Sequence, residues 1–196
     1  MTPAPVLTVY GLLLAAGSSE RMGSVNKLLA EVGGMPVVRG SAMAVLEAVE
    51  KLFVVTGYQA DRVRGALDGL NVRFVHNPNF LMGMGTSVAV GAGAVPSDAA
   101  GVLIALGDMP FLAPATIAAL VGAFHEDPSR VYVPTFHGER GNPVLWPARC
   151  IPALTASAGD VGGRVLLGSE RVHRVPVPDA FVVKDLDTPG DLAQLT

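Results

Sequence analysis

The sequence predicts an α/β protein with a mostly parallel sheet covered by helices on both faces. Apolar runs of strand length alternate along the chain with segments whose apolar residues recur at helical spacing. One run, Val102–Leu106, is apolar at every position, which is typical of a central parallel strand buried on both faces. With 196 residues, half of them hydrophobic and 16% charged, the chain can bury one substantial core.

The elements expected up to residue 133 follow this alternation. A first strand is expected at Leu7–Leu14. A helix is expected over Pro36–Glu50, because Val38, Ala42, Val45, Leu46 and Val49 recur at helical spacing. Pro36 fits its first turn, where a backbone N–H would have no partner within the helix. Crossovers between parallel strands are expected to be right-handed. The remaining strands are predicted at Leu52–Thr56, Val72–Val75, Val102–Leu106 and Val131–Val133, with helices around Ala60–Leu67, from near Ser87 and from near Ala113.

The pattern loosens from Pro134 onward. Residues Thr135–Trp146 predict a loop and hairpin in place of another strand–helix repeat. Two short helices, a strand and a terminal helix are expected after it, at Pro147–Ala156, Gly162–Leu167, Phe181–Leu186 and from Pro189. Since the chain has no internal repeat, low-complexity tract or linker, residues 1–196 are expected to form one domain. Within it, a regular core of about 1–133 precedes an elaboration of about 134–188.

Composition excludes several classes of protein. A net charge of −3 argues against a broad nucleic-acid surface. The sequence contains no apolar segment long enough for a membrane span and no export signal at its N-terminus. The single cysteine, Cys150, excludes an internal disulfide and a multi-cysteine metal cluster. We therefore expect a cytoplasmic protein that binds neither nucleic acid nor membranes.

The segment Leu12–Leu29 is the most informative. An apolar run ends at Ala16, and Gly17-Ser18-Ser19 then turns the chain. Successive backbone amides in such a turn form a concave nest for anions. Arg21 and Lys27 follow within one loop's reach, so the segment favours an oligophosphate ligand. The Gly-Ser dipeptide alone is more typical of an ordinary turn, and the segment is neither a P-loop nor a G-x-G-x-x-G fingerprint.

Asp108 comes just after the wholly apolar strand, between Gly107 and the strand-stopping Pro110. Ligands of open parallel sheets bind beyond the carboxyl ends of the strands, so Asp108 is expected to face the first loop. A carboxylate in that place suits Mg²⁺, which takes one or two carboxylates together with substrate phosphates. The alternative is that Asp108 caps the helix that starts near Ala113.

Two further carboxylates, those of Asp185 and Asp187, lie in the late string Lys184–Pro189. On a strand the two would point to the same side, where a second metal contact is feasible. Asp187 is equally suited to cap the terminal helix, with Pro189 in its first turn. The two roles are compatible.

Three further segments carry small or polar residues suited to ligand binding. Phe80–Ser87 leads with hydroxyls into a helix N-terminus, where either an anion or a simple N-cap is expected. Arg140–Val144 (RGNPV) and Gly159–Arg164 (GDVGGR) lie later in the chain. The four histidines show no metal-ligand spacing.

Taken together, these strings resemble, in order, the signatures of nucleotidyltransferases that activate sugars and the molybdenum cofactor. Those signatures are L-A-x-G-x-x-x-R-M-G with a following lysine, L-x-D-x-P, R-G-H-P-V, G-D-x-G-A-R and D-x-D-T-P. The resemblance implies a single three-layer, Rossmann-like nucleotidyltransferase domain, with a nucleotide-binding core and an acceptor-side elaboration. In this family the first loop wraps a nucleoside triphosphate, and the L-x-D-x-P carboxylate binds metal.

The resemblance also implies roles for residues of this chain. The catalytic residues would be Arg21, Lys27 and Asp108, and Mg²⁺ would lie on Asp108 and Asp187, with Asp185 in reserve. Asn142 departs from the histidine common in the family, which leaves the acceptor less defined. The nucleotide would contact Leu14, Ala15, Ala16, Gly17, Ser18, Ser19, Arg21, Lys27, Gly57, Gly107 and Asp108. The acceptor would contact Gly83, Thr86, Ser87, Asn142, Pro143, Asp160 and Arg164.

Within the MobA-like nucleotidyltransferases, the set of strings is most similar to the molybdenum cofactor cytidylyltransferases. These join CMP from CTP to the phosphate of molybdopterin and release pyrophosphate. Their guanylyl relatives have L-A-G-G in the first loop, whereas this chain has Leu14-Ala15-Ala16-Gly17, and the methyl group of Ala16 would narrow the base pocket in favour of a pyrimidine. The implied partners are CTP, a molybdopterin-type acceptor, and a molybdoenzyme or its chaperone.

Three alternatives remain open from the sequence. The first is a nucleotidyltransferase of the same fold that uses GTP or another phosphorylated acceptor. The second is a glycosyltransferase, which would need an Asp-x-Asp motif where this chain has Pro110. The third is a non-catalytic chaperone that carries the molybdenum cofactor, which would have no use for the charged set Arg21, Lys27 and Asp108.

Overall fold

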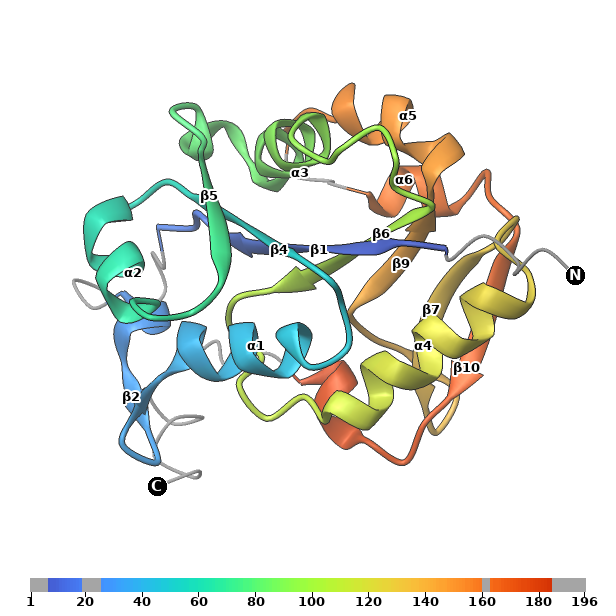
Figure 1. The fold of residues 1–196 in the computed structure, drawn as a ribbon, viewed down its shortest axis with the longest axis horizontal. Coiled ribbons are helices and arrows are strands. Elements are labelled where there is room, and N and C mark those ends of the chain that lie inside the picture. Colours follow the sequence, from blue (N-terminus) through green and yellow to red (C-terminus); the bar gives the residue numbers. More distant parts are fainter. Residues whose placement is uncertain (1–6, 19–25, 160–162, 185–196) are drawn as a thin grey trace, which may run out of the picture.

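The computed structural model describes residues 7–18, 26–159 and 163–184 (Figure 1). In this part of the chain an eight-stranded sheet has the order β10-β7-β9-β6-β1-β4-β5, with β8 paired to β7. Most neighbouring strands are parallel, so the expected mostly parallel α/β sheet is confirmed. The strands are β1 (Val9–Ala15), β4 (Leu52–Thr56), β5 (Val72–His76), β6 (Gly101–Leu106), β7 (Val131–Phe136), β8 (Glu139–Arg140), β9 (Val144–Pro147) and β10 (Val172–Pro176).

β1 is the central strand that organises the sheet. It pairs in parallel with β4 on one side and with β6 on the other. All its residues are buried, because helices cover both faces. Successive side chains alternate between faces, so Leu13 belongs to one hydrophobic core and Leu12 to the other.

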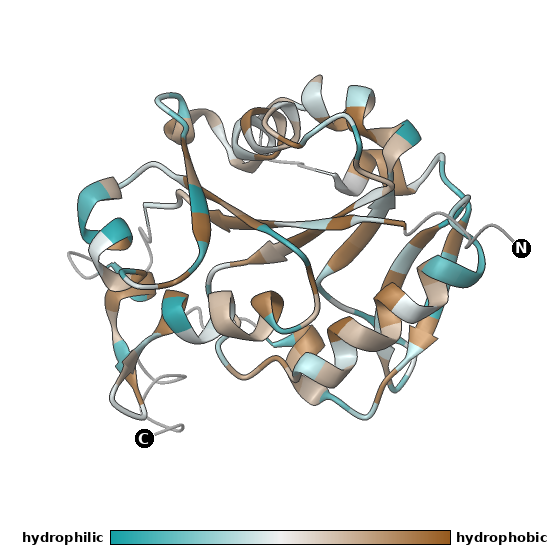
Figure 2. Ribbon diagram, in the orientation of Figure 1, coloured by the Kyte–Doolittle hydropathy of each residue, from teal (hydrophilic) through white to brown (hydrophobic). Residues whose placement is uncertain are grey.

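Each face of the sheet has its own helical layer (Figure 1). Helices α1 (Val37–Leu46), α2 (Ala60–Ala66) and α4 (Pro114–Glu126) share the core that contains Leu13. Helices α3 (Met84–Gly93), α5 (Ile151–Thr155) and α6 (Arg164–Leu167) share the core that contains Leu12. Figure 2 shows hydrophobic residues concentrated along the strands and hydrophilic ones on outer helices and loops. The three-layer arrangement follows from this patterning.

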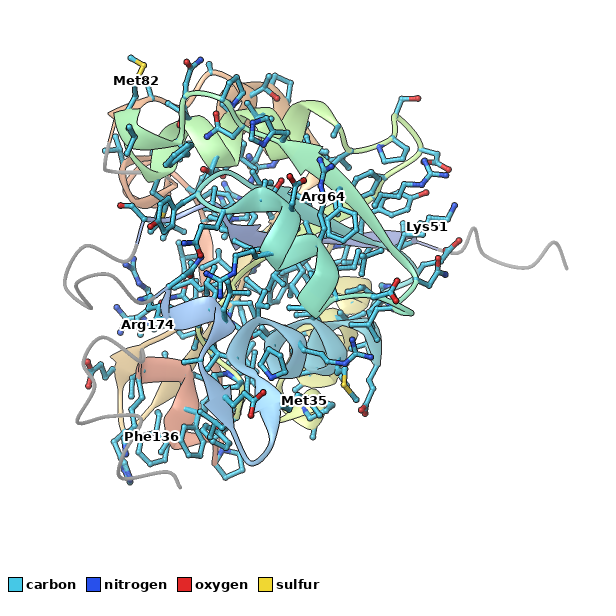
Figure 3. The ribbon with its side chains drawn as sticks, turned by 90° about the vertical axis from the view of Figure 1, so that its left-hand side faces the viewer. Met35, Lys51, Arg64, Met82, Phe136 and Arg174 are labelled. Carbon is cyan, nitrogen blue, oxygen red and sulfur yellow. The ribbon has the colours of Figure 1, made fainter. Side chains whose placement is uncertain are left out.

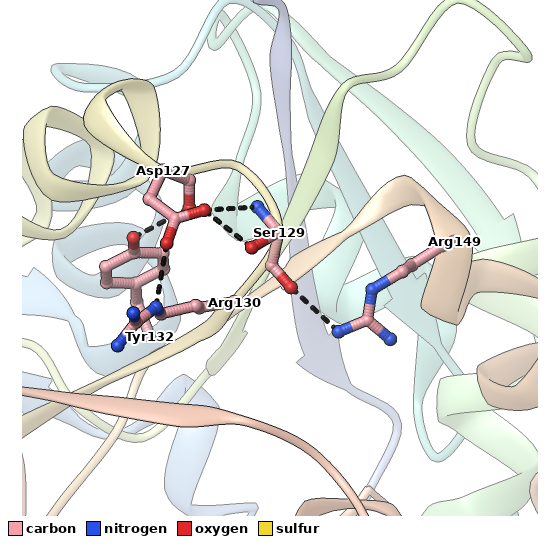
Figure 4. A network of polar contacts seen from close by, with 5 residues as sticks. All are labelled: Asp127, Ser129, Arg130, Tyr132 and Arg149. Atoms are coloured by element: carbon pink, nitrogen blue, oxygen red, sulfur yellow. Dashed lines mark hydrogen bonds and ion pairs between the residues drawn. The ribbon is translucent and has the colours of Figure 1, made fainter.

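A polar network orders the turn between α4 and β7 (Figure 4). One carboxylate oxygen of Asp127 accepts hydrogen bonds from the backbone N–H and the hydroxyl of Ser129, and the other accepts from Arg130 Nε at 2.7 Å. The Tyr132 hydroxyl donates to the carbonyl of Asp127, and Arg149 donates to the carbonyl of Ser129. The hydrogen bonds from Ser129, followed by that from Arg130, lower the pKa of Asp127.

Short elements fill the loops between these layers. Residues Glu31–Val32 (β2) and Met35–Pro36 (β3) form a small antiparallel hairpin before α1. The sequence pattern did not predict this hairpin, nor the 3-10 turns η2 (Lys27–Leu29) and η3 (Phe80–Met82). The helix predicted at Pro147–Ala156 is present as the 3-10 turn η4 (Ala148–Cys150) followed directly by α5. Where the predicted helices do occur, their ends differ: α1 ends at Leu46 and α3 begins at Met84.

The expected strand at Phe181–Leu186 is wrong over the residues that the structure describes. Ala180–Val183 form a 3-10 turn, η6, because the side chain of Asp179 accepts a hydrogen bond from the N–H of Phe181. The missed strand is β10, which pairs in parallel with β7 at the edge of the sheet. Exposed polar residues such as Arg174 (Figure 3) interrupt its apolar pattern. The predicted helix from Pro189 lies outside the described residues.

The predicted hairpin after Pro134 exists, but its second arm is also part of the main sheet. β9 lies between β6 and β7 and runs antiparallel to both. The strand predicted at Val102–Leu106 therefore has one parallel neighbour, β1, and one antiparallel neighbour, β9. Burial on both faces is retained, which is why the sequence could not distinguish the two arrangements. Among the described helices, none combines the length and apolarity required to cross a bilayer.

Candidate active site

The site begins where β1 and β6 end side by side. Helices α1 and α3, which flank these strands in the chain, lie on opposite faces of the sheet, and such a switch point leaves a crevice at the carboxyl ends of the strands. Gly107 donates a backbone hydrogen bond to the carbonyl of Leu14 at 2.9 Å. A Cβ at Gly107 would lie only 2.9 Å from that same oxygen, so the close approach requires glycine.

Lys27 and Asp108 meet across this crevice. Lys27 Nζ lies 2.5 Å from Asp108 Oδ2, and the two side chains are only 18% and 13% exposed. Lys27 opens the turn η2, whose N-cap is Asn26: its Oδ1 accepts a hydrogen bond from the N–H of Leu28 at 3.1 Å. The structure thus brings together the cation of the first loop and the carboxylate that follows β6.

Asp108 does not cap the helix after it. The start of α4 is instead tied to Asp179, whose Oδ2 accepts hydrogen bonds from Ala113 N and Thr116 Oγ1, both at 2.9 Å. The Asp179 carboxylate is buried and also holds η6 through Phe181. The alternative capping role for Asp108 is therefore wrong, and sequence reasoning missed Asp179 because the segments that it joins are distant in the chain.

One oxygen of Asp108 fits a divalent cation. Oδ1 is buried and, among the described residues, has no hydrogen-bond partner, which is costly for a carboxylate. Mg²⁺ accepts one or two carboxylates and completes its shell with water and substrate phosphates. In the described part of the chain no group of three or more His, Cys, Asp or Glu side chains could hold a metal by itself. The donor set thus suits a cation that is completed by substrate oxygens.

The other residues predicted to contact the nucleotide divide into buried and open positions. The side chains of Ala15 and Ala16 are buried, and Ala16 packs close to Gly57, where an added Cβ would lie 2.9 Å from the Ala16 methyl carbon. The N–H of Tyr58 donates to the carbonyl of Ala16 at 3.1 Å. Gly17 is exposed, with open space around its Cα. Gly17 therefore leaves the loop backbone accessible, whereas the two alanines shape it from within.

A cavity of about 420 Å³ adjoins the ends of β1 and β6. Leu14 and Leu106 form part of its wall, and Leu106 precedes Asp108 by two residues, but neither Lys27 nor Asp108 lines the cavity. Its lining combines apolar side chains from several strands and helices with polar groups on the segment 139–142. The lining includes Leu14, Met84, Val88, Ile104, Leu106, Glu139, Arg140, Asn142, Trp146, Gly163 and Leu167.

The predicted acceptor residues surround this cavity unequally. Asn142 lines it, and the N–H of Asn142 donates to the carbonyl of Val182 at 2.8 Å. Thr86 and Ser87 do not line it, and their hydroxyls accept hydrogen bonds from Asn77 Nδ2 at 2.9 and 3.0 Å. These hydroxyls hold the loop before α3, and their binding role remains a prediction. Gly83 caps that helix with φ 102°, and Pro143 follows Asn142 through a cis peptide bond.

Close packing joins the remaining acceptor segments to the cavity. A Cβ at Gly85 would lie 2.6 Å from the backbone of Ala158, so the start of α3 packs against the string that begins at Gly159. Gly163 approaches Trp146 in the same way, at 2.9 Å, and Arg164 opens α6. The candidates outside the described residues are Ser19, Arg21, Asp160, Asp185 and Asp187.

Sequence reasoning missed several residues around the site. Trp146 lines the cavity, and no local motif marks it; Leu106 also lines it and is the first residue of the L-x-D-x-P string. Arg140 is the first residue of the RGNPV string, which could have identified it as a lining residue together with Asn142. Ser41 of α1 contacts the backbone on both sides of Asp108, yet in the sequence it is one small residue inside a helix.

The chain is similar to known proteins that carry different names. Residues 11–175 match the family described as the MobA-like NTP transferase domain. A molybdenum cofactor cytidylyltransferase from Escherichia coli K12 is 26% identical over 92% of this chain and 91% of its own length. A nicotine blue oxidoreductase from Paenarthrobacter nicotinovorans is 28% identical over 95% and 96%. The bifunctional protein GlmU of Kineococcus radiotolerans is 40% identical over 63% of this chain, which covers only 26% of that protein.

Solved structures show the same fold over almost the whole chain. A nucleotidyl transferase from Methanothermobacter, Mth528, aligns with a TM-score of 0.82 at 26% identity, covering 95% of both chains. Rv0371c from Mycobacterium tuberculosis H37Rv aligns with a TM-score of 0.84 at 26% identity, covering 97% of this chain and 98% of its own. Rv0371c has also been solved in complex with manganese. Together with the cation–carboxylate pair at the switch point, these findings show that the chain is a nucleotidyltransferase and belongs to the MobA-like NTP transferase family.

Proposed function

We propose that this enzyme transfers CMP from CTP to the phosphate of a molybdopterin-type acceptor and releases pyrophosphate. The observation that carries the proposal is the Lys27–Asp108 pair beyond the ends of β1 and β6. We assign its ammonium group to phosphates and its carboxylate to the metal, and the cavity that begins at Leu106, two residues before Asp108, is large enough for a small molecule. The E. coli relative with a cytidylyltransferase name covers nearly the full chain and supports the choice of nucleotide and acceptor.

In the proposed reaction, an oxygen of the acceptor phosphate attacks the α-phosphorus of CTP. A bond forms between them, and the bond from that phosphorus to the oxygen bridging it to the β-phosphorus breaks, so pyrophosphate leaves. A phosphate is already anionic at neutral pH, so no base is needed to activate it. The work of the protein is to position the two reactants and to stabilise charge.

The residues of the chain divide this work. The backbone of Gly17-Ser18-Ser19, with Arg21 and Lys27, would hold the β- and γ-phosphates that leave. Asp108, with Asp187 as the expected second ligand, would hold Mg²⁺, which when bound neutralises charge on the phosphates. That Rv0371c was solved with manganese supports a divalent cation in this family.

The acceptor would occupy the cavity beside these groups. Its apolar wall of Leu14, Leu106 and Trp146 suits the flat faces of a heterocycle, and Asn142 and Arg140 offer polar groups at one side. Gly83, Thr86, Ser87, Pro143, Asp160 and Arg164 are proposed to form the rest of the acceptor surface. A molybdoenzyme or its chaperone would then receive the product.

The test is a panel of CTP, GTP, ATP and UTP with Mg²⁺ and a molybdopterin-type acceptor, scored by pyrophosphate release. We expect release to require both the acceptor and the metal and to be fastest with CTP. A reaction without acceptor measures background hydrolysis, and excess chelator measures the metal-independent rate. Faster release with GTP would overturn the cytidylyl assignment. No release above the acceptor-free background with any of the four nucleotides would mean that this acceptor is not the substrate and would point to another phosphorylated one. Relatives of similar identity carry names as different as cytidylyltransferase and oxidoreductase, so this outcome is tested directly.

A further inference from the structure

The turn that carries Asp108 is held from outside by one side chain of α1. Ser41 Oγ accepts a hydrogen bond from the N–H of Met109 at 3.1 Å and lies 3.0 Å from the carbonyl oxygen of Gly107, to which it can donate. Its hydroxyl thus bridges the residues on either side of Asp108. Ser41 is 2% exposed, so water does not compete for these contacts.

Two further contacts fix the position of this bridge. A Cβ at Gly40 would lie 3.0 Å from Pro110 Cβ, which shows that α1 passes close to the turn. On the opposite side Gly107 is tied to β1 through the carbonyl of Leu14. The backbone around Asp108 is therefore clamped between β1 and α1, and Ser41 supplies the hydrogen bonds on the α1 side.

A hydroxyl is not needed at this position for the helix itself. Ser41 is followed in α1 by Ala42, which is also fully buried, and alanine is the better helix former. The contact of Ser41 Oγ with the carbonyl of Val37, at 3.1 Å, is the ordinary back-bond of a helical serine. Its contacts with Gly107 and Met109 have no such local explanation.

We propose that Ser41 is a positioning residue that sets the orientation of the Asp108 carboxylate toward a divalent cation. The inference rests on the proposed role of Asp108 as a metal ligand. Ser41 touches neither nucleotide nor metal in this scheme and acts only through the backbone of the 107–109 turn. Groups that orient a metal ligand typically change metal affinity by about tenfold or more when they are removed.

The test measures Mn²⁺ binding to the full-length protein by electron paramagnetic resonance, with and without CTP. We expect Ser41→Ala to bind Mn²⁺ about tenfold more weakly than the wild type and Asp108→Ala to lose the site. Thr155→Ala is the matched control: the Thr155 hydroxyl makes a similar helical back-bond, to Ile151 at 2.9 Å, in a helix on the other face. It should bind Mn²⁺ like the wild type.

A purely structural role for Ser41 would lower the unfolding midpoint without changing the Mn²⁺ affinity of the folded protein. That result, or a wild type that binds no Mn²⁺, would overturn the proposal. Should Ser41→Ala fail to fold, Ser41→Cys provides a variant of similar volume with a much weaker hydrogen-bonding group. Pyrophosphate release by the wild type is measured in parallel. If it is absent while Ser41→Ala still weakens Mn²⁺ binding, the proposed transfer reaction is wrong and the positioning role stands.

Discussion

Lys27 Nζ and Asp108 Oδ2 lie 2.5 Å apart at the carboxyl ends of β1 and β6, and both side chains are largely shielded from water. The pair neutralises the carboxylate while the other oxygen, Oδ1, has no hydrogen-bond partner among the described residues. In the proposed reaction a divalent cation would bind the carboxylate of Asp108, and phosphates of the nucleotide would bind the ammonium group of Lys27. The two halves of the pair can therefore be tested separately.

Replacing Asp108 by alanine should abolish metal-dependent pyrophosphate release and leave the protein folded. Losing a fixed charge contact of this kind costs about 3 kcal/mol in the transition state, or roughly a hundredfold in rate. The measurement is release as a function of Mg²⁺ concentration, with circular dichroism to monitor folding. Asp68→Ala removes an exposed acid elsewhere and should behave like the wild type. Near-normal, Mg²⁺-dependent turnover by Asp108→Ala would refute the metal assignment.

Replacing Lys27 by alanine should weaken the binding of CTP more than the binding of the acceptor. Its charge is proposed to contact the phosphates of the nucleotide, and a charged hydrogen bond of this type is worth about 1.5–3 kcal/mol, or roughly tenfold to a hundredfold in apparent affinity. The measurement is the KM for each substrate at saturating levels of the other. Lys51→Ala is the control, since Lys51 directly precedes β4, near the opposite end of β1, and lies over the ring of Tyr10 (Figure 3). An unchanged KM for CTP in Lys27→Ala would contradict the phosphate role.

Replacing Asp179 by alanine should be among the most destabilising changes in the chain. Its buried carboxylate accepts hydrogen bonds from Ala113, Thr116 and Phe181, and the variant would leave these donors unpaired. We expect a loss of about 3 kcal/mol in the free energy of unfolding, measured in urea. Asp61→Ala, whose side chain is 99% exposed, should change it by less than about 0.5 kcal/mol. A similar small loss for both variants would show that Asp179 does not hold α4 and η6 together.

The sequence sufficed for most elements whose apolar pattern is strong. β4 has the predicted bounds, Leu52–Thr56, because every residue is buried and Gly57 follows directly. β10 could not be predicted, because an edge strand with exposed His173 and Arg174 has a weak apolar pattern. The turn η6 was mistaken for a strand, because only the side chain of Asp179 distinguishes the two conformations.

The candidate site divides in the same way. Lys27 and Asp108 were predictable because each follows a buried strand in a recognisable string, and the topology of parallel strands brings such positions to one edge. Ser41 and Trp146 were not, because their relation to the site arises from packing between elements that are distant in sequence. The hydroxyls of Thr86 and Ser87 were ambiguous, since a loop amide and a ligand phosphate would both use them.

The Arg149–Glu170 pair predicts a pH dependence of stability with a defined sign. Arg149 NH2 lies 2.6 Å from Glu170 Oε2, and this hydrogen bond holds the pKa of Glu170 below its ordinary value of 4.5. Because the folded-state pKa is depressed, the stabilisation is fully present above that ordinary value and is lost as the pH falls through the folded-state pKa. Because the side chain of Arg149 is about half exposed, the stabilisation by this pair should not exceed about 1 kcal/mol.

The measurement compares the free energy of unfolding of the wild type and Glu170→Gln, in urea, at about pH 7 and about pH 3. The wild type should be more stable than Glu170→Gln at the higher pH, and this difference should shrink at the lower pH, because protonation of Glu170 removes the charge that Arg149 stabilises. Asp61→Asn tests a fully exposed acid whose partner Arg64 lies 3.9 Å away, and it should show almost no gap at either pH. A gap between wild type and Glu170→Gln that is the same at both pH values would mean that the ionised carboxylate contributes nothing, and that the variant acts through packing alone.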